Sequence, residues 1–385
     1  MARILFLATD EITRDPRIRR AVWHAASGGH ETVGICRRTA SPIPLPGLGT
    51  AYRWGRITPL RFPERGPLAQ QHAVTREIRG LMRLARLAWR TGALLGPARN
   101  VSEVDVVHAN DFETLPAGWI IARRHGARLV YDAHEIYTEQ EPHGPKAYRA
   151  IARRLESFFA RRADATITVS QPIASDLRTR LGLNREPYVV LNAPARDGRA
   201  VKPSPSPVRA IYQGGPGPGR RIEDIFDAAP FVEGATLAIR VSTADIDRLR
   251  AEASKRGLDG LVEILDPVPA DRILDGLRDF SIGLIINRPV TLNDELVFPN
   301  KLFEYMMAGL ATVAPALPGL APLIDAEGVG VTFEPGNPEA LGRALTELAA
   351  DRPALDEMRL RARDAAVQRF NAEAQLPALA AAWGL

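Results

Sequence analysis

The run FPNKLFEYMMAGLATVAPALPG, residues 298–319, constrains the fold more than any other part of the chain. Asn300 is a favourable N-cap for the apolar stretch that follows it, and Gly309 can end a helix without a Cβ penalty. Residues 310–314 then read as a short buried strand that stops at Pro315. The run therefore predicts a short helix, a tight exit and a buried strand.

Two polar side chains interrupt this apolar helix, and both lie in its first turn: Lys301 and Glu304. The first backbone N–H groups of a helix have no partner within it, and the positive end of the helix attracts anions. A carboxylate one turn in does not bind a phosphate, but it can accept hydrogen bonds from a ribose beside it. Two interpretations stay open, an anion site of this kind or an ordinary capped helix whose glutamate complements the dipole.

The same run resembles the donor-site helix of retaining GT4-type glycosyltransferases of GT-B fold, with the signature P-x-K-x-x-E-Y-M-x-x-G-x-P. Ala311 stands where the family usually has its last proline, and Leu296 stands where it usually has a second acidic residue, beside Asn293, Asp294 and Glu295. The matching positions are Pro299, Lys301, Glu304, Tyr305, Met306 and Gly309. The resemblance implies that a sugar nucleotide contacts Pro299, Asn300, Lys301, Leu302 and Glu304.

Composition indicates a soluble globular chain of about two domains, because 385 residues exceed one typical domain and 25% of them are charged. Cys36 is the single cysteine, which excludes an internal disulfide and fits a reducing compartment. The apolar run at the start is too short for a signal peptide or a membrane span, so it reads as a first strand. We therefore expect a cytoplasmic protein.

The net charge of +5 hides an asymmetry: residues 1–196 carry 30 basic and 18 acidic side chains, whereas the remainder carries 20 and 27. An anionic acceptor, anionic lipid headgroups or nucleic acid would each fit a basic first half. Charge alone does not decide between them. The resemblance implies a sugar-nucleotide donor and an acceptor as partners, and no nucleic acid.

The chain opens as a βαβ unit, with strands at 2–9 and 31–36 and a helix between them. The loop before the helix places Arg17 and Arg19 near the carboxyl edge of the first strand, where ligands bind in open α/β sheets. It resembles the family's D-x-R segment, which implies contact with donor phosphate or acceptor. Arginines on a solvated face are an equally open interpretation.

Residues 41–70 are rich in Pro and Arg and predict a long loop. Residues 75–95 then alternate apolar and Arg positions at helical spacing, which predicts a basic amphipathic helix. Such a helix can lie on an anionic membrane at the inner face, or pack its apolar stripe on the sheet while the arginines stay solvated. We favour packing.

Polar side chains follow two successive buried strands, at 104–108 and 128–132, as expected at the rim of an α/β active site. The two clusters are His108, Asn110 and Asp111, then Asp132, His134 and Glu135. They resemble the family's H-A-x-D and D-x-H-E segments, which implies acceptor contact by His108 and catalytic positions at Asn110, Asp111, His134 and Glu135. Asn110 stands where many relatives have histidine. A metal site is the rival interpretation, but the spacings match no metal signature.

We predict a first domain at 1–195, a Pro-rich linker at 196–207 and a second domain at 208–371, with a last helix at 372–385 that crosses back to the first. After the strand at 208–212, a Gly-rich loop can turn backbone N–H groups toward a phosphate. Its spacing, and the absence of an acidic residue at the next strand end, argue against a dinucleotide site. The resemblance implies donor contacts by Gly214, Gly215, Gly217 and Arg220, and by Val268 at the nucleotide base.

Together these features predict two doubly wound Rossmann-like domains in a GT-B α/β fold. The implied activity is a retaining, metal-independent transfer from a nucleotide-diphosphate sugar to a secondary-metabolite, polysaccharide or glycolipid acceptor, without a cofactor. Two alternatives stay open: a nucleotide-sugar epimerase using His134 and Glu135, and a catalytically silent partner subunit, to which Leu296 points. The nucleotide base, the acceptor and the oligomeric state are not predicted.

Overall fold

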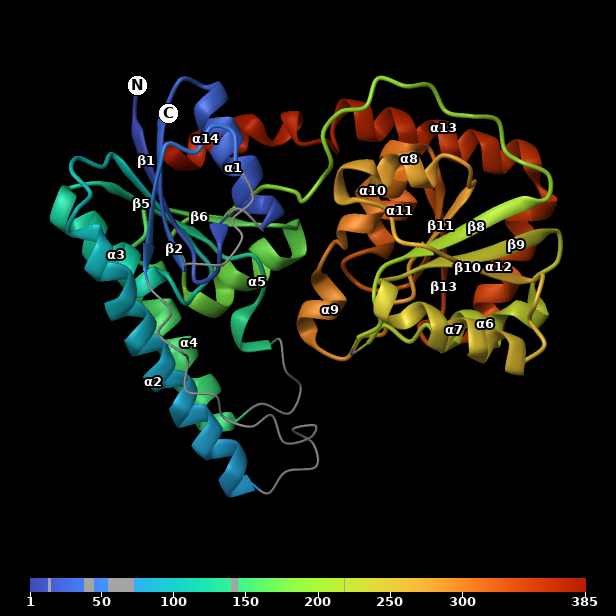
Figure 1. Cartoon of the computed structure of the whole chain (residues 1–385), viewed down its shortest axis with the longest axis horizontal. Helices are drawn as coiled ribbons and strands as arrows, with labels where there is room; N and C mark the ends of the chain where they lie inside the picture. Colours follow the sequence, from blue (N-terminus) through green and yellow to red (C-terminus); the bar gives the residue numbers. More distant parts are fainter. Residues whose placement is uncertain (13–14, 38–44, 55–72, 140–144, 218) are drawn as a thin grey trace. The chain divides into compact units, whose positions relative to one another are not determined.

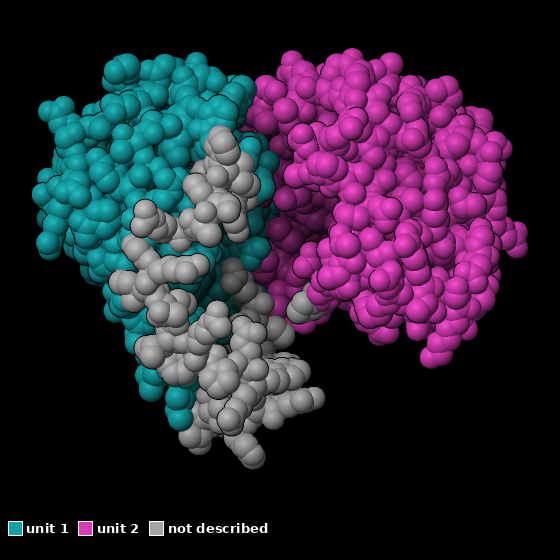
Figure 2. All heavy atoms as spheres, in the orientation of Figure 1, with its two compact units in different colours: residues 1–190, 376–385 teal, residues 191–375 magenta. Residues whose placement is uncertain are grey.

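The computed structural model describes residues 1–12, 15–37, 45–54, 73–139, 145–217 and 219–385. These residues form two compact units, Met1–Val190 with Leu376–Leu385, and Leu191–Gln375 (Figures 1 and 2). The backbone N–H of Leu191 donates to Oε1 of Gln375 at 3.2 Å, so the two ends of the second unit meet.

In the first unit the described strands form a parallel sheet of order β3-β2-β1-β4-β5-β6-β7. The strand order reverses between β1 and β4, and ligands of open α/β sheets bind at the carboxyl ends beside such a reversal. The strands are β1 (Arg3–Leu7), β2 (Glu31–Arg37), β3 (Thr50–Trp54), β4 (Val106–Asn110), β5 (Arg128–Asp132), β6 (Ala165–Thr168) and β7 (Tyr188–Val189).

Helices cover both faces of this sheet (Figure 1). The buried side chains of α1 and α14 share one core with β1, β4, β5 and β6, whereas α2 packs with α3 and α4. The helices are α1 (Pro16–Ser27), α2 (Ala73–Ala98), α3 (Leu115–His125), α4 (Lys146–Ala160), α5 (Gln171–Leu181), the 3-10 turn η3 (Tyr137–Glu139) and α14 (Leu376–Trp383). Two of these helices begin at a side-chain cap: an oxygen of Asp15 caps α1, and an oxygen of Ser170 caps α5.

One strand lies where the sequence predicts a loop. Residues 50–54 extend the sheet as β3, paired with β2 from Val33–Thr50 to Arg37–Trp54. The prediction is wrong here because the stabilising contact is distant: the Trp54 ring meets Trp89 of α2 at 5.5 Å between centroids. The predicted basic helix is present as α2, and its contacts with α3, α4 and β3 agree with packing on the unit.

The second unit holds a parallel sheet of order β10-β9-β8-β11-β12-β13. The strands are β8 (Val208–Gln213), β9 (Ala235–Arg240), β10 (Val262–Leu265), β11 (Ile282–Leu284), β12 (Ala311–Pro315) and β13 (Gly330–Phe333). The helices are α6 (Glu223–Ala228), α7 (Thr243–Lys255), α8 (Ile273–Leu277), α9 (Leu292–Leu296), α10 (Asn300–Ala308), α11 (Ala321–Glu327), α12 (Pro338–Ala350) and α13 (Arg352–Gln368), with 3-10 turns η4 (Ala229–Phe231), η5 (Ala270–Arg272) and η6 (Glu373–Gln375).

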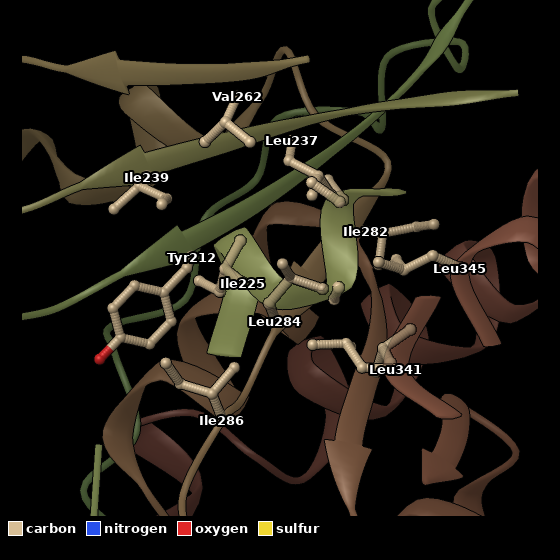
Figure 3. Close-up of a cluster of buried hydrophobic side chains, with 14 of the residues drawn as sticks. Tyr212, Ile225, Leu237, Ile239, Val262, Ile282, Leu284, Ile286, Leu341 and Leu345 are labelled. Atoms are coloured by element: carbon tan, nitrogen blue, oxygen red, sulfur yellow. The ribbon is translucent and has the colours of Figure 1, made fainter. Parts of the chain in front are cut away.

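Aliphatic side chains from this sheet meet those of α6 and α12 in one core, where Leu284 faces Ile225 and Leu341 lies beside Leu345 (Figure 3). Helices α8 and α13 instead pack on α10. The segment 287–297, predicted as loop, contains α9, which starts with a capping box between Thr291 and Asp294.

The predicted linker is part of the second unit. Arginines of α13 donate to its backbone: Arg359 Nη2 to Lys202 O at 2.7 Å, and Arg363 Nη2 to Arg199 O at 2.8 Å. These bonds hold the segment to α13, and the two compact units divide at 190/191. At the other end of the chain, residues 376–385 fold with the first unit.

No helix among the described residues combines the length and apolar character needed to cross a bilayer.

Candidate active site

Helix α10 starts one residue earlier than the sequence predicts. Pro299 is its N-cap, in an extended conformation with φ −68° and ψ 139°, and Asn300 is the first helical residue. No side chain of the described residues makes a capping hydrogen bond at this helix start. The exit agrees with the prediction, since Gly309 adopts the left-handed conformation with φ 75°. The N–H groups of Asn300 and Lys301 belong to the first turn of α10, where backbone N–H groups lack intrahelical partners.

Lys301 is the central feature of the second unit. Its side chain is buried, with Nζ 4.0 Å from the centroid of the Tyr212 ring and without a hydrogen-bond partner among the described residues. Burial, with Arg220 as a second positive charge, lowers the pKa of Lys301 to about 7, and Glu304 only partly opposes this. A buried amine that makes no hydrogen bond to the protein is suited to binding an anionic ligand.

The Gly-rich loop lies against this amine. Gly214 has φ 143°, and a Cβ at this position would stand 3.1 Å from Lys301 Nζ, so the backbone approaches the amine as only glycine allows. Further along, Gly217 and Arg220 exchange backbone hydrogen bonds in a tight turn, which leaves the Arg220 side chain exposed. Gly215 lies in between, and its carbonyl accepts from the Tyr212 hydroxyl at 3.3 Å.

Tyr305 fixes α10 to the sheet. Its hydroxyl donates to Leu284 O at 3.1 Å and accepts from the backbone N–H of Gln213 at 3.1 Å. Helix α10 is thus tied to the carboxyl ends of β8 and β11. Glu304 is half-buried on the same helix, in the turn next to Lys301.

One further residue that the sequence did not indicate, Arg240, lies at these strand ends. Arg240 is buried at the end of β9, and its Nη1 donates to Gln213 Oε1 and to Gly276 O, both at 3.0 Å. Burial lowers the pKa of Arg240. Val268 lies close by, since a Cβ on Gly276 would stand 3.3 Å from its Cγ1. The signal available in the sequence for Arg240 was an arginine at the end of an otherwise apolar strand.

The Leu302 side chain is fully buried, and its N–H donates to Pro299 O at 2.9 Å. Donor contact by Leu302 stays a prediction. Leu296, which replaces the family's second acid, ends α9, with its backbone packed against Gly319.

In the first unit, a cavity of about 420 Å³ opens at the carboxyl ends of β4 and β5. The predicted residues Arg17, Asp111, His134 and Glu135 all line it, whereas Arg19 is half-buried on α1 outside the lining. Arg17 Nη2 lies 2.8 Å from Asp15 Oδ2 and 3.4 Å from Asp111 Oδ2.

Asp111 is held in an unusual state. Its φ of 63° is the one positive value among the described residues other than glycine, a strain that tends to persist at functional positions. Burial raises the pKa of Asp111 to about 6 even though Arg17 opposes the shift. Burial and Arg17 lower the pKa of His134 to about 4, so this ring is neutral near pH 7 and can accept a hydrogen bond from a hydroxyl group.

His108 and Asn110 lie inside the unit. The His108 ring is fully buried, with Nε2 3.4 Å from Asp132 Oδ2 and Nδ1 accepting from Trp383 Nε1 at 3.0 Å. Asn110 is 2% exposed and its amide donates to Leu7 O at 2.9 Å. His108 and Asn110 thus lie in the core of the unit and outside the cavity lining, because alternation along β4 does not separate rim from core at a strand buried on both faces. Acceptor contact by His108 and a catalytic position at Asn110 stay predictions.

The described residues contain no group of three or more His, Cys, Asp or Glu side chains arranged to hold a metal ion.

Comparisons with known proteins cover most of the chain. The model for Glycosyltransferase Family 4 matches residues 18–194, and the model for glycosyl transferases group 1 matches residues 221–351. No curated protein matches the chain significantly by sequence.

Several solved structures share the fold over almost the whole length. Sucrose-phosphate synthase from Thermosynechococcus elongatus has a TM-score of 0.67 at 15% identity, covering 98% of this chain and 97% of its own. HepE from Anabaena in complex with UDP has a TM-score of 0.69 at 16% identity, covering 98% of both chains. The same protein in complex with UDP-glucose has a TM-score of 0.69 at 15% identity, covering 99% of both. From the two family models and this shared fold we conclude that the chain belongs to the GT4-type glycosyltransferases and has the GT-B fold.

Proposed function

We propose that this glycosyltransferase moves a sugar from a nucleotide-diphosphate sugar to an acceptor hydroxyl, with retention of the anomeric configuration and without a metal ion. The observation that carries the proposal is the buried, unbonded Nζ of Lys301 between the Gly-rich loop and the start of α10. HepE, a structural neighbour, binds UDP and UDP-glucose.

Departure of the nucleotide diphosphate creates negative charge, and fixed positive groups lower the barrier by stabilising it. Lys301 and Arg220 supply two cationic side chains, and the N–H groups of Asn300 and Lys301 supply the helix end. Glu304, one turn further, accepts hydrogen bonds from the ribose. Stabilisation by these groups takes the role that a divalent cation has in metal-dependent transferases.

A retaining transfer does not require a protein base, because the departing phosphate oxygen can take the acceptor proton on the same face of the sugar. This removes the need for a base at Asn110, whose amide is bonded to Leu7 O. Asp111 and His134 then orient the acceptor hydroxyl, since a neutral imidazole and a carboxylate both accept hydrogen bonds.

A thermal-shift panel tests the donor assignment. It pairs UDP, GDP, ADP and TDP with their glucose, mannose and N-acetylglucosamine derivatives, on wild type, Lys301→Met and Lys255→Met. Lys255 is an exposed lysine of α7 and serves as the matched control. We expect one nucleotide series to stabilise wild type and Lys255→Met by about 2.7 kcal/mol at a hundredfold excess over Kd, and Lys301→Met much less.

The nucleotide sugar found in this panel then tests the chemistry. Glu304→Gln should lower turnover, transfer should continue in EDTA, and the anomeric proton signal of the product should show retention. A product of inverted configuration would refute the proposed mechanism, and absence of any shift in the panel would favour a silent partner subunit.

A further inference from the structure

The cavity of the first unit has a wall that the proposed transfer does not use. Arg17, Asp111 and His134 line the cavity at the ends of β4 and β5, and in the proposed function Asp111 and His134 orient the acceptor hydroxyl. Further lining residues come from two helices and a turn, and we call them the basic wall: Arg83, Arg86, Tyr137, Tyr148 and Arg149. Arg83 and Arg86 are three residues apart on α2, so they share a helix face.

A glycine brings the two helices of this wall together. A Cβ on Gly80 of α2 would stand 2.8 Å from the Cβ of Tyr148 of α4, so only glycine permits this approach. As a result the Arg83 guanidinium lies 5.5 Å from the centroid of the Tyr148 ring, and the hydroxyls of Tyr148 and Tyr137 are 2.9 Å apart. Arg149, next to Tyr148, extends the basic wall along α4.

Two carboxylates beside the wall pair with arginines. Glu113 pairs with Arg90, which does not line the cavity. Glu139 pairs with Arg149 and also with Arg180, whose Nη1 lies 3.1 Å from it.

Positive charge remains on the cavity lining, because it carries four arginines against three carboxylates, and one of these, Glu113, pairs with Arg90 outside the lining. Arg86 is exposed, and Arg83 lies one turn away on the same helix. Burial raises the pKa of Tyr137, so its hydroxyl stays neutral and can donate a hydrogen bond. Two or three guanidinium groups beside neutral hydroxyls are the arrangement that binds phosphate oxygens bidentately.

We propose that the acceptor carries a phosphate group and that Arg83, Arg86 and Arg149 bind it, while Asp111 and His134 hold the hydroxyl that receives the sugar. The inference rests on the proposed function and specifies the class of acceptor. Two sources supply this chemistry, a small phosphorylated sugar or polyol and the headgroup of a phospholipid.

The test uses full-length protein saturated with the nucleotide found in the panel, so that the anion site at Lys301 is filled. Calorimetry then compares glucose 6-phosphate with glucose and glycerol 3-phosphate with glycerol, and flotation compares phosphatidylglycerol with phosphatidylcholine vesicles. The variants are Arg86→Ala, Arg86→Lys, the double variant Arg83→Ala/Arg86→Ala, and Arg124→Ala, an exposed arginine of α3 outside the cavity. Circular dichroism verifies that each variant is folded.

We expect a phosphorylated probe to bind wild type at least about tenfold more tightly than its uncharged counterpart, because bonds to charged groups exceed neutral ones. The double variant should lose about tenfold or more, Arg86→Lys should lose less than Arg86→Ala, and Arg124→Ala should stay within about twofold of wild type. Binding of the sugar or polyol phosphate alone identifies a small acceptor, and retention on phosphatidylglycerol alone identifies a lipid headgroup.

The inference is overturned if no phosphorylated probe or vesicle binds the nucleotide-loaded protein, or if Arg124→Ala weakens binding as much as Arg86→Ala. Failure of every nucleotide to bind is a different result, which refutes the proposed function.

Discussion

Donor binding should be coupled to proton uptake at Lys301. In the unliganded protein, burial holds the pKa of this lysine at about 7. A diphosphate placed against Nζ favours the charged form and returns the pKa toward or above the ordinary value of about 10.4. The donor should therefore bind together with a proton whenever the free lysine is neutral.

The size of the effect follows from the pKa. Roughly 90% of the free side chains are neutral at pH 8 and roughly 10% at pH 6, so binding should take up about 0.9 proton at pH 8 and about 0.1 at pH 6. The sign follows from linkage: the complex binds more protons, so affinity falls as pH rises, by about tenfold between pH 6 and pH 8.

Calorimetry in buffers of different ionisation enthalpy measures the proton uptake directly. A nucleotide sugar is the suitable ligand, because its diphosphate has no group that titrates near pH 7. Histidine side chains of the second unit do not contribute to the measured proton uptake, because all seven histidines precede residue 191 and lie outside that unit. Lys301→Met should bind the donor weakly and without proton uptake, whereas Lys255→Met should behave as wild type. Wild type taking up less than about 0.2 proton at pH 8 would refute the reasoning.

Three further changes test other parts of the structure. Asp111→Gly should leave the free energy of unfolding in urea titrations unchanged or raise it by about 1 kcal/mol, because glycine tolerates the left-handed backbone. The same change should lower turnover. Trp383→Phe leaves His108 Nδ1 buried without its donor, so the free energy of unfolding should fall by about 1–3 kcal/mol in urea titrations; an unchanged value would contradict the buried bond. Arg359→Met removes the donor to Gly309 O and should lower the free energy of unfolding by about 3 kcal/mol, with less loss for Arg343→Met, an exposed arginine of α12.

The second unit was more predictable from the sequence than the first, because its signals act over a short range. The run at 298–309 combines a helix start, a glycine exit and two polar residues in one turn, and each acts within a few residues. The N-cap was wrong by one position because Pro299 supplies the extended entry that Asn300 was expected to supply. Arg240 was missed because its partners, Gln213 and Gly276, are distant in sequence.

The first unit shows where periodicity fails. A strand buried on both faces has no polar alternation, so the sequence does not distinguish His108, inside the core, from Asp111, on the rim of the cavity. Strand β3 was hidden for a related reason, since its stabilising partners lie on β2 and α2. Residues 41–44 and 55–70 of the predicted loop lie outside the described part of the chain.

The hydrogen bond between Trp383 and His108 joins positions 275 residues apart, and it has a consequence for the order of folding. The second unit is continuous in sequence, so all of it leaves the ribosome before α14 does. The first unit begins synthesis earlier but lacks the helix that covers His108 until residues 376–385 have emerged. We expect chains truncated after residue 375 to contain a protease-resistant second unit and a protease-sensitive first unit, which becomes resistant when residues 376–385 are present.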